Sequence, residues 1–258
     1  MITAIGQKVS LPPLIGTAGW AIPAYVRDEF PHEGSLLQRY AHLMSCAEVN
    51  SSFYRPHRRS TWERWADTVP DNFRFSVKMP KAISHVARLV DVEAPLERFI
   101  GEVTGLANRL GILLLQLPPS FVFDPEVIAA FVRTLRALSD VQIAIEPRHL
   151  SWFDPASDAW LAELKVPRVA ADPAKAPAAA RPGGWQGLSY YRLHGSPVMY
   201  RSAYDEECLL HYASLLGADA QAKREAWCIF DNTANSAALG DALKLARHLR
   251  LDGRLVSK

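Results

Sequence analysis

The feature of this sequence that most constrains its fold is the repeated alternation of short apolar segments with segments of helical periodicity. Residues 111–117 and 141–145 are apolar runs of the kind found in strands buried on both faces. Each is followed by an Asp-Pro pair, at Asp124 and Asp154, where aspartate is a favoured N-cap and proline a favoured first helical residue. Strands that alternate with helices in this way predict a parallel sheet.

About eight strand signals follow one another along the chain, at residues 14–20, 46–50, 73–78, 111–119, 141–145, 166–171, 188–195 and 226–230. In a chain of 258 residues this pattern predicts a single (β/α)8 TIM-type barrel, a fold that typically takes about 250 residues. We therefore expect one domain over residues 1–258. The alternative is an open doubly wound sheet, but Gly16-Thr17-Ala18-Gly19 lacks the third glycine of a phosphate-binding turn.

Two parts of the alternation are less regular. Between the first two strands the predicted helix is short, with Ser35 as its N-cap followed by Leu36, Leu37 and Tyr40 at helical spacing. Residues 173–187 are rich in proline, alanine and glycine, and we expect them to form a mobile surface segment.

Composition narrows the class of protein. Apolar residues make up 49% of the chain, enough for a large core, while the net charge of +2 is too weak for a dedicated nucleic-acid domain. The cysteines are Cys46, Cys208 and Cys228, an odd number without metal-ligand spacing, which indicates reduced thiols. No signal peptide or membrane-spanning run is evident. We expect a cytoplasmic protein without membrane contact, and the oligomeric state stays open.

Polar residues follow nearly every predicted strand. In a TIM-type barrel these strand ends meet at one mouth, where functional groups gather. The strand-end residues are Glu48, Asn50, Lys78, Gln116, Glu146, Arg148, His149, Asp172, Arg192, His194, Asp231 and Asn232. Burying charges costs on the order of several kcal/mol each unless they are paired, so we expect Glu146 to meet Arg148, Arg192 or Lys78. The residues are either a functional site or a ring of paired charges that closes the barrel.

Several strand ends also match a known family. The matching segments are Gly16-Thr17-Ala18-Gly19-Trp20, Glu48-Val49-Asn50-Ser51-Ser52-Phe53-Tyr54, Phe75-Ser76-Val77-Lys78, Gln116-Leu117-Pro118-Pro119, Glu146-Pro147-Arg148-His149 with Trp152, Tyr191-Arg192-Leu193-His194-Gly195 and Asp231-Asn232-Thr233. Over about residues 14–249 the chain resembles the YecE-like barrels, domain of unknown function 72. The resemblance implies a TIM-type barrel but no agreed activity. Some members' barrels are similar to metal-dependent endonucleases that act at abasic DNA sites.

The sequence departs from the family at a few positions. The family usually has Asn where this chain has Asp231, so this chain carries an additional carboxylate, and an amide role at that position is not transferable. Val49, Ser52 and Ser84 replace Ile, Thr and Thr, which are conservative changes.

The first functional hypothesis is an enzyme, for instance a hydrolase, that acts on a small anionic substrate containing phosphate, such as a nucleotide or nucleic acid. Glu48 or Glu146 would be the general base, His194 the general acid, and Asp231 a further catalytic carboxylate. Lys78, Arg148 and Arg192 would hold the anion, with phosphate near the two arginines. The other expected substrate-binding residues are the aromatic Trp20, Tyr54, Trp152 and Tyr200, and the polar Asn50, Gln116, His149, Asp172 and Asn232.

Three alternatives remain open. A divalent metal could bind among Glu48, Glu146, His149, Asp172, His194 and Asp231, but the nearby cations would repel it, so we predict no metal site and no cofactor. A non-catalytic module could bind an anion or nucleic acid with the same groups. A carbohydrate-active barrel could use Glu48 and Glu146 as paired carboxylates.

Overall fold

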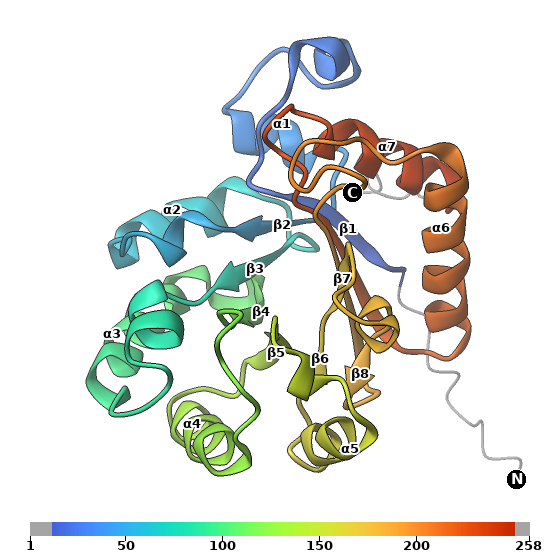
Figure 1. The fold of residues 1–258 in the computed structure, drawn as a ribbon. Coiled ribbons are helices and arrows are strands. Elements are labelled where there is room, and N and C mark those ends of the chain that lie inside the picture. Colours follow the sequence, from blue (N-terminus) through green and yellow to red (C-terminus); the bar gives the residue numbers. More distant parts are fainter. Residues whose placement is uncertain (1–11, 251–258) are drawn as a thin grey trace, which may run out of the picture.

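The strands form one sheet that nearly closes into a barrel (Figure 1). The structure is a computed structural model and describes residues 12–250. The strands found there are β1 (Leu14–Ala18), β2 (Cys46–Val49), β3 (Arg74–Lys78), β4 (Leu110–Gln116), β5 (Gln142–Glu146), β6 (Pro167–Arg168), β7 (Ala170–Asp172), β8 (Gly183–Gly184), β9 (Leu188–Leu193) and β10 (Glu225–Phe230). Their order is β7-β9-β10-β1-β2-β3-β4-β5-β6-β8, and only the β6–β8 pair is antiparallel.

Strands β6 and β7 act as two halves of one interrupted strand that joins the ends of the sheet. Val169 separates them, and its amide donates to the Ile145 carbonyl at 2.8 Å. Before Val169 the chain pairs with β5, and after it the chain pairs with β9. Counting β6 and β7 as one position and setting β8 aside, the ten strands of residues 12–250 give eight parallel positions. The predicted TIM-type barrel is therefore confirmed.

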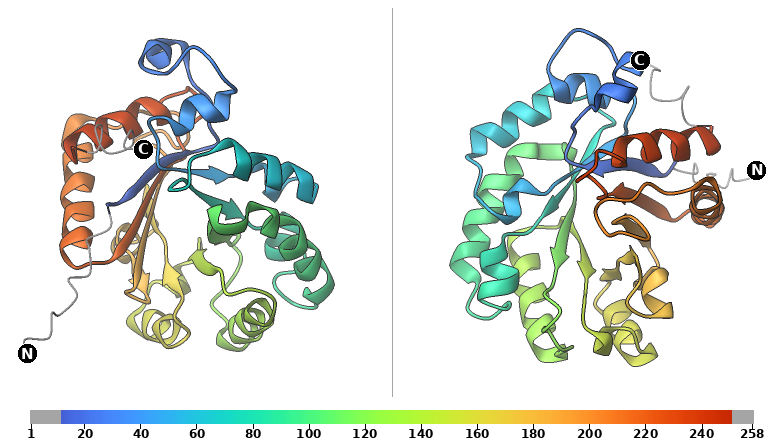
Figure 2. Two further views of the ribbon diagram at one scale, coloured as in Figure 1. Left: turned by 180° about the vertical axis from the view of Figure 1, so that it is seen from behind. Right: turned by 45° about the horizontal axis from the view of Figure 1, so that its top comes forward.

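Helices surround the sheet on its outer side (Figure 2). The α-helices are α1 (Leu36–Ala41), α2 (Arg59–Thr68), α3 (Glu93–Val103), α4 (Pro125–Leu138), α5 (Pro155–Glu163), α6 (Glu206–Gln221) and α7 (Ala238–His248). Shorter helical turns are η1 (Ala24–Glu29), η2 (Ser51–Phe53), the π-helical η3 (Ala82–Val86), η4 (Thr104–Arg109), η5 (Leu150–Trp152) and η6 (Pro177–Ala180). Within residues 12–250, no helix has both the length and the apolar character needed to cross a membrane.

The predicted helix starts are confirmed by their caps. Asp124 accepts hydrogen bonds from the first-turn amides of α4, and Asp154 does the same for α5. Ser35 begins the short helix α1 with a capping box that includes Gln38. These caps satisfy amides that have no partner within a helix, so the local sequence marks where these three helices begin.

The segment between β7 and β9 differs from the expected mobile surface loop. It contains η6 and β8, and the amide of Gly184 donates to Asp158 Oδ1 at 3.0 Å. The amide of Trp185 donates to the Val166 carbonyl at 3.0 Å. The segment thus packs against the barrel, because two backbone amides near its end are bound by neighbouring elements. No α-helix lies between β7 and β9 in the described structure.

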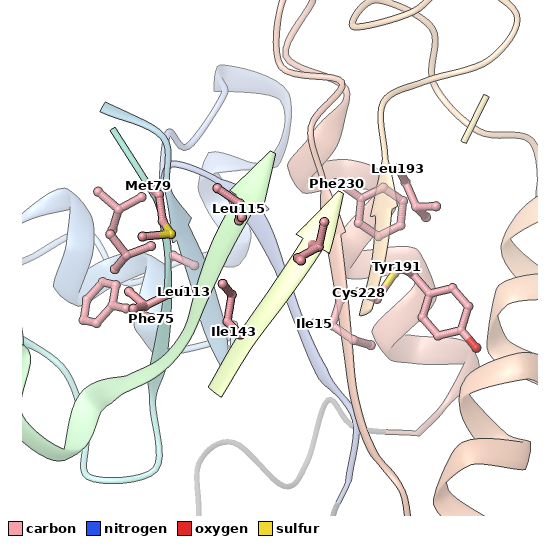
Figure 3. Packing of buried hydrophobic residues seen from close by; sticks show 14 of the residues in the cluster. Ile15, Phe75, Met79, Leu113, Leu115, Ile143, Tyr191, Leu193, Cys228 and Phe230 are labelled. Carbon is pink, nitrogen blue, oxygen red and sulfur yellow. The ribbon is translucent and has the colours of Figure 1, made fainter. Parts of the chain in front are cut away.

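The alternation of side chains along each strand separates two apolar layers. Leu113, Leu115 and Ile143 point outward and belong to the larger core, which also includes Phe230 on another side of the barrel (Figure 3). The residues between them in sequence point into the barrel and form a second, smaller core of Cys46, Ile112, Leu114, Ala144, Val169, Leu188, Tyr190, Trp227 and Ile229. Cys46 and Cys228 are buried and, with Cys208, are free thiols, as expected.

The inward-facing positions become polar toward the carboxyl ends of the strands. Leu114 is followed at the same parity by Gln116, and Ala144 by Glu146, which pairs in register with Gln116. Tyr190 is followed in the same way by Arg192. The barrel interior therefore has an apolar lower part and a charged mouth.

Candidate functional site

Arg192 lies at the centre of a buried polar network at the barrel mouth. Its guanidinium contacts Glu48 from β2, with Nη2 2.7 Å from Oε1. It also forms ion pairs with Glu146 from β5 at 3.1 Å and with Asp231, just after β10, at 3.0 Å. One cation thus joins three carboxylates that are far apart in sequence.

Amide side chains complete the surroundings of Arg192. Gln116 Oε1 accepts from Nη1 and Asn50 Oδ1 accepts from Nη2, each at 3.4 Å. The guanidinium is fully buried, and its Nε donates to Glu48. The expectation that Arg192 itself binds a substrate anion does not fit these contacts, because its donors are already taken by acceptors of the protein.

His194 extends the network across the mouth. Its Nδ1 lies 3.0 Å from Asp231 Oδ2, and its Nε2 lies 2.9 Å from Glu146 Oε1. Arg148 Nη2 also meets Glu146 Oε1, at 2.6 Å. The predicted pairing of Glu146 with Arg148 or Arg192 is therefore confirmed with both arginines. Arg148 Nη2 also lies 3.0 Å from His194 Nε2, so the ring, Glu146 and Arg148 meet at one point.

The network keeps its carboxylates ionised despite their burial. Burial raises the pKa of Glu146, but the positive charges of Arg148 and Arg192 and the contact with His194 outweigh it and hold the pKa well below its usual range. Burial also raises the pKa of Asp231, but Arg192 and His194 lower it by more, so the pKa lies below its usual range. Both groups stabilise the fold above their unfolded pKa, and this stabilisation is lost as the pH falls through the folded pKa.

Tyr190 belongs to this network although it was not predicted from the sequence. Its hydroxyl donates to Glu48 Oε2 at 2.9 Å and lies 2.8 Å from Ser76 Oγ. The available signal was parity, because Tyr190 alternates in phase with Arg192 and His194 on β9. The hydroxyl binds the lone pairs of Glu48 that Arg192 leaves free.

We expect Tyr190→Phe to lower the free energy of unfolding by about 1–3 kcal/mol, because it leaves buried oxygens of Glu48 and Ser76 with one partner fewer. Tyr25→Phe is the matched control, since the Tyr25 hydroxyl donates to the Ser236 carbonyl at 2.8 Å but is exposed to water. Urea unfolding of both variants measures the difference. Equal losses would show that the Tyr190 contacts do not stabilise the network.

Lys78, at the end of β3, is the cation of the mouth whose charge is unpaired. Its Nζ lies 4.3 Å from the centroid of the Phe53 ring and makes no hydrogen bond or ion pair with residues 12–250. Burial and the positive charge of Arg192 lower the pKa of Lys78, and the opposing attraction of Glu48, Glu146 and Asp231 is too small to restore it. Lys78 is therefore the basic group of the network with donors free for a ligand.

Of the four predicted catalytic residues, Asp231 is the one with side-chain surface open to solvent. Its side chain is 10% exposed, whereas those of Glu48, Glu146 and His194 are fully buried. Asn50 Nδ2 donates to Asp231 Oδ1 at 3.3 Å. Glu48 and Glu146 therefore hold Arg192 and His194 in place, and their burial does not fit the expected general-base role.

The predicted aromatic residues do not gather in one place. Trp152 is completely buried, and its indole N–H donates to the Phe121 carbonyl at 2.9 Å, so it is a core residue and does not fit a substrate-binding role. Trp20 packs edge-on against Trp65, with ring centroids 5.1 Å apart. Only Tyr200 reaches the network, with its ring edge-on to His194 at 5.5 Å.

Three predicted polar residues have structural partners outside the network. Asn232 is buried and donates to Asp241 Oδ2 at 2.8 Å, which fixes the turn after β10 and does not fit substrate contact. Asp172 accepts from the Tyr204 hydroxyl at 2.7 Å. His149 begins η5, where its ring accepts from a backbone amide. Asp241 was missed, because it lies within helix α7 and not at the end of a strand.

Tyr54 lies away from the charged network. Its side chain is 79% exposed and lines a separate pocket formed by the segments after β2 and β3. Within residues 12–250, no group of three or more His, Cys, Asp or Glu side chains is arranged to hold one metal ion. The absence of a metal site therefore remains a prediction from the sequence.

Comparison with known proteins identifies relatives of this chain. A family model described as "Protein of unknown function DUF72" matches residues 14–258. The UPF0759 protein YecE of Escherichia coli strain K12 is 31% identical over 140 residues, which cover 54% of this chain and 49% of that protein. The matched region thus spans about half the length of this relative.

Solved structures agree over a larger part of the chain. A DUF72 family protein from Thermotoga maritima has a TM-score of 0.75 at 22% identity, covering 93% of this chain and 100% of the other. A DUF72 family protein from Enterococcus faecalis has a TM-score of 0.73 at 21% identity, covering 92% and 95%. At these identities the likeness shows a shared fold.

Proposed function

This chain belongs to the DUF72 family of proteins of unknown function, and we propose that it is an enzyme that carries out acid–base chemistry on a small anionic substrate at the barrel mouth. The substrate class we favour is a compact phosphate-containing molecule. Lys78 binds the anion, and Asp231 is the carboxylate that exchanges a proton with it.

The observation that carries this proposal is the unpaired charge of Lys78. Every other cation of the network is bound to a carboxylate, whereas Lys78 Nζ has only the Phe53 ring beside it. Glu48, Glu146 and Asp231 attract this ammonium from a distance, but none forms an ion pair with it. A nearly buried ammonium without a direct ion pair is costly, and a bound anion would offset that cost. Arg148 adds a second incomplete contact, since its buried Nε has no hydrogen-bond partner in the described part of the chain.

Asp231 fits the proton-transfer role by position. Its carboxylate has open surface and is held from behind by Arg192 and His194, each at 3.0 Å. A side chain held in this way loses little entropy when substrate binds, which favours catalysis. Because the family that the sequence resembles usually has Asn here, this chemistry is proposed for this chain and not for the whole family.

The test is turnover of a panel of phosphorylated alcohols, sugars and nucleotides in D2O, followed by ¹H and ³¹P NMR. We expect at least one compound to react or exchange a proton, and Asp231→Asn to lower that rate by about 10²–10⁴-fold. Phosphate affinity should not fall in this variant, since the change removes a negative charge near Lys78. Full activity of Asp231→Asn would exclude Asp231 as the acid–base group, and no reaction with any compound would favour a binding protein.

The carbohydrate alternative is less compatible with the geometry. A glycosidase needs two carboxyl groups that flank the bond to be broken. Here Glu48 and Glu146 are both buried and share the same guanidinium as their ion-pair partner. Neither is free to approach a sugar, so we do not propose this function.

A further inference from the structure

A second pocket lies beside the charged mouth, between the segment after β2, the segment after β3 and helix α3. Its volume is about 580 Å³, which falls within the roughly 300–1,000 Å³ of small-molecule sites. Phe53 forms the boundary between the two places, because it lines this pocket and also contacts Lys78 Nζ at 4.3 Å. The pocket does not include Lys78, Arg192 or Asp231.

The wall of the pocket is apolar, aromatic and held in place. Trp62, Ile83 and Phe99 are buried residues of the core that line it. His57 is fixed by Ser51 Oγ at 2.8 Å and lies edge-on to Trp62 with 5.3 Å between ring centroids. Flat aromatic walls of this kind fit a planar ring, which can make edge-to-face contacts with them.

The charge at the rim of the pocket is positive. Arg55 and Lys81 are exposed, line the pocket and form no ion pair with any residue of the described range. The acidic residue of the lining, Glu102, is already bound by Arg98 at 3.0 Å. Two unpaired cations above an apolar wall are complementary to a ligand that carries a negative group next to a ring.

We infer that this pocket binds an aromatic ring bearing one anionic group, such as an aryl carboxylate or aryl sulfonate. The ring occupies the space between Phe53, Trp62 and Phe99, and the anion lies at the rim near Arg55 and Lys81. The pocket is a site separate from the mouth, so this inference does not depend on the proposed acid–base chemistry.

The test uses 1-naphthalenesulfonate as the ligand and the uncharged 1-naphthalenemethanol as its analogue, titrated against the full chain by calorimetry. Ala82→Trp fills the pocket from an exposed position and should abolish binding of both compounds. The double variant Arg55→Glu, Lys81→Glu should lower the affinity for the sulfonate by about tenfold or more, equivalent to about 1.4 kcal/mol. It should leave the uncharged analogue within about twofold.

The matched control is Arg58→Glu, Arg64→Glu, which changes the net charge equally at exposed residues outside the pocket lining. Its sulfonate affinity should stay close to that of the wild type. Lys78→Met should also leave naphthalenesulfonate binding unchanged. The pocket hypothesis and the hypothesis of an anion site at Lys78 are therefore tested by different variants, and either can fail without the other. Unaltered binding to Ala82→Trp, or equal affinity for both compounds in the wild type, would overturn the inference.

Discussion

Arg192→Met is expected to lower the free energy of unfolding by about 3–5 kcal/mol at neutral pH, because it leaves buried carboxylates without their cation. The guanidinium is within 3.1 Å of Glu48, Glu146 and Asp231. Folded domains are stable by only about 5–15 kcal/mol, so this loss is a large fraction of the total. Equilibrium unfolding in urea measures it.

Arg168→Met is the matched control for that variant. Arg168 is equally buried and contacts Asp158 at 2.7 Å, but the Asp158 side chain is 30% exposed and water can solvate it when the arginine is removed. We therefore expect a smaller loss. A loss for Arg192→Met below about 1 kcal/mol, the range of surface ion pairs, would contradict the account of a buried network.

The cost of Arg192→Met should also depend on pH. In the wild type the pKa of Glu146 is held well below its usual range, although burial alone raises it. Without Arg192 the carboxylates take up protons more readily. The variant therefore loses less unfolding free energy, relative to the wild type, at acidic pH than at neutral pH. The difference in unfolding free energy between wild type and variant should shrink between about pH 7 and pH 4.

Lys78→Met is expected to weaken phosphate or sulfate binding at the mouth by about 30-fold or more, since removing one partner of a buried charge pair costs roughly 2–5 kcal/mol. Burial and the charge of Arg192 lower the pKa of Lys78. Because the ammonium form binds the anion, affinity should fall as the pH rises through this lowered pKa. Lys78→Arg should keep the affinity and lose most of this pH dependence, because arginine stays charged.

Lys81→Met is the control for position and charge. Lys81 lies three residues further along the chain, is exposed and lines the other pocket. Its removal should leave phosphate binding at the mouth unchanged in calorimetric titration. Equal losses for the Lys78 and Lys81 variants would show that only the general positive charge of this region attracts the anion.

The fold could be predicted because its signals are local. Asp124 and Asp154 place helix starts, and apolar runs such as residues 141–145 place buried strands. The break between β6 and β7 could not be predicted from the sequence, because the pairing on either side of Val169 depends on β5 and β9. The order of helices and strands therefore follows from local sequence signals, whereas the way the barrel closes depends on contacts between distant strands.

The candidate site was predictable in composition but not in its contacts. Parity correctly placed Glu48 with Asn50, and Arg192 with His194, on the inner face. Which cation remains unpaired depends on how side chains from β2, β5, β9 and β10 meet, and no local pattern contains that information. Trp152 illustrates the same limit, because its burial follows from the turn η5 and not from its place after a strand.

Anion binding by Lys78 is tested most directly by a crystal structure of the protein soaked in selenate, an anomalous scatterer that resembles sulfate and phosphate. We expect a selenium peak at the barrel mouth with an oxygen within about 3 Å of Lys78 Nζ, a normal distance for a charged hydrogen bond. The peak should be absent in crystals of Lys78→Met. A mouth without selenate in the wild type, or a peak that persists in Lys78→Met, would contradict the proposal that Lys78 is the anion-binding group.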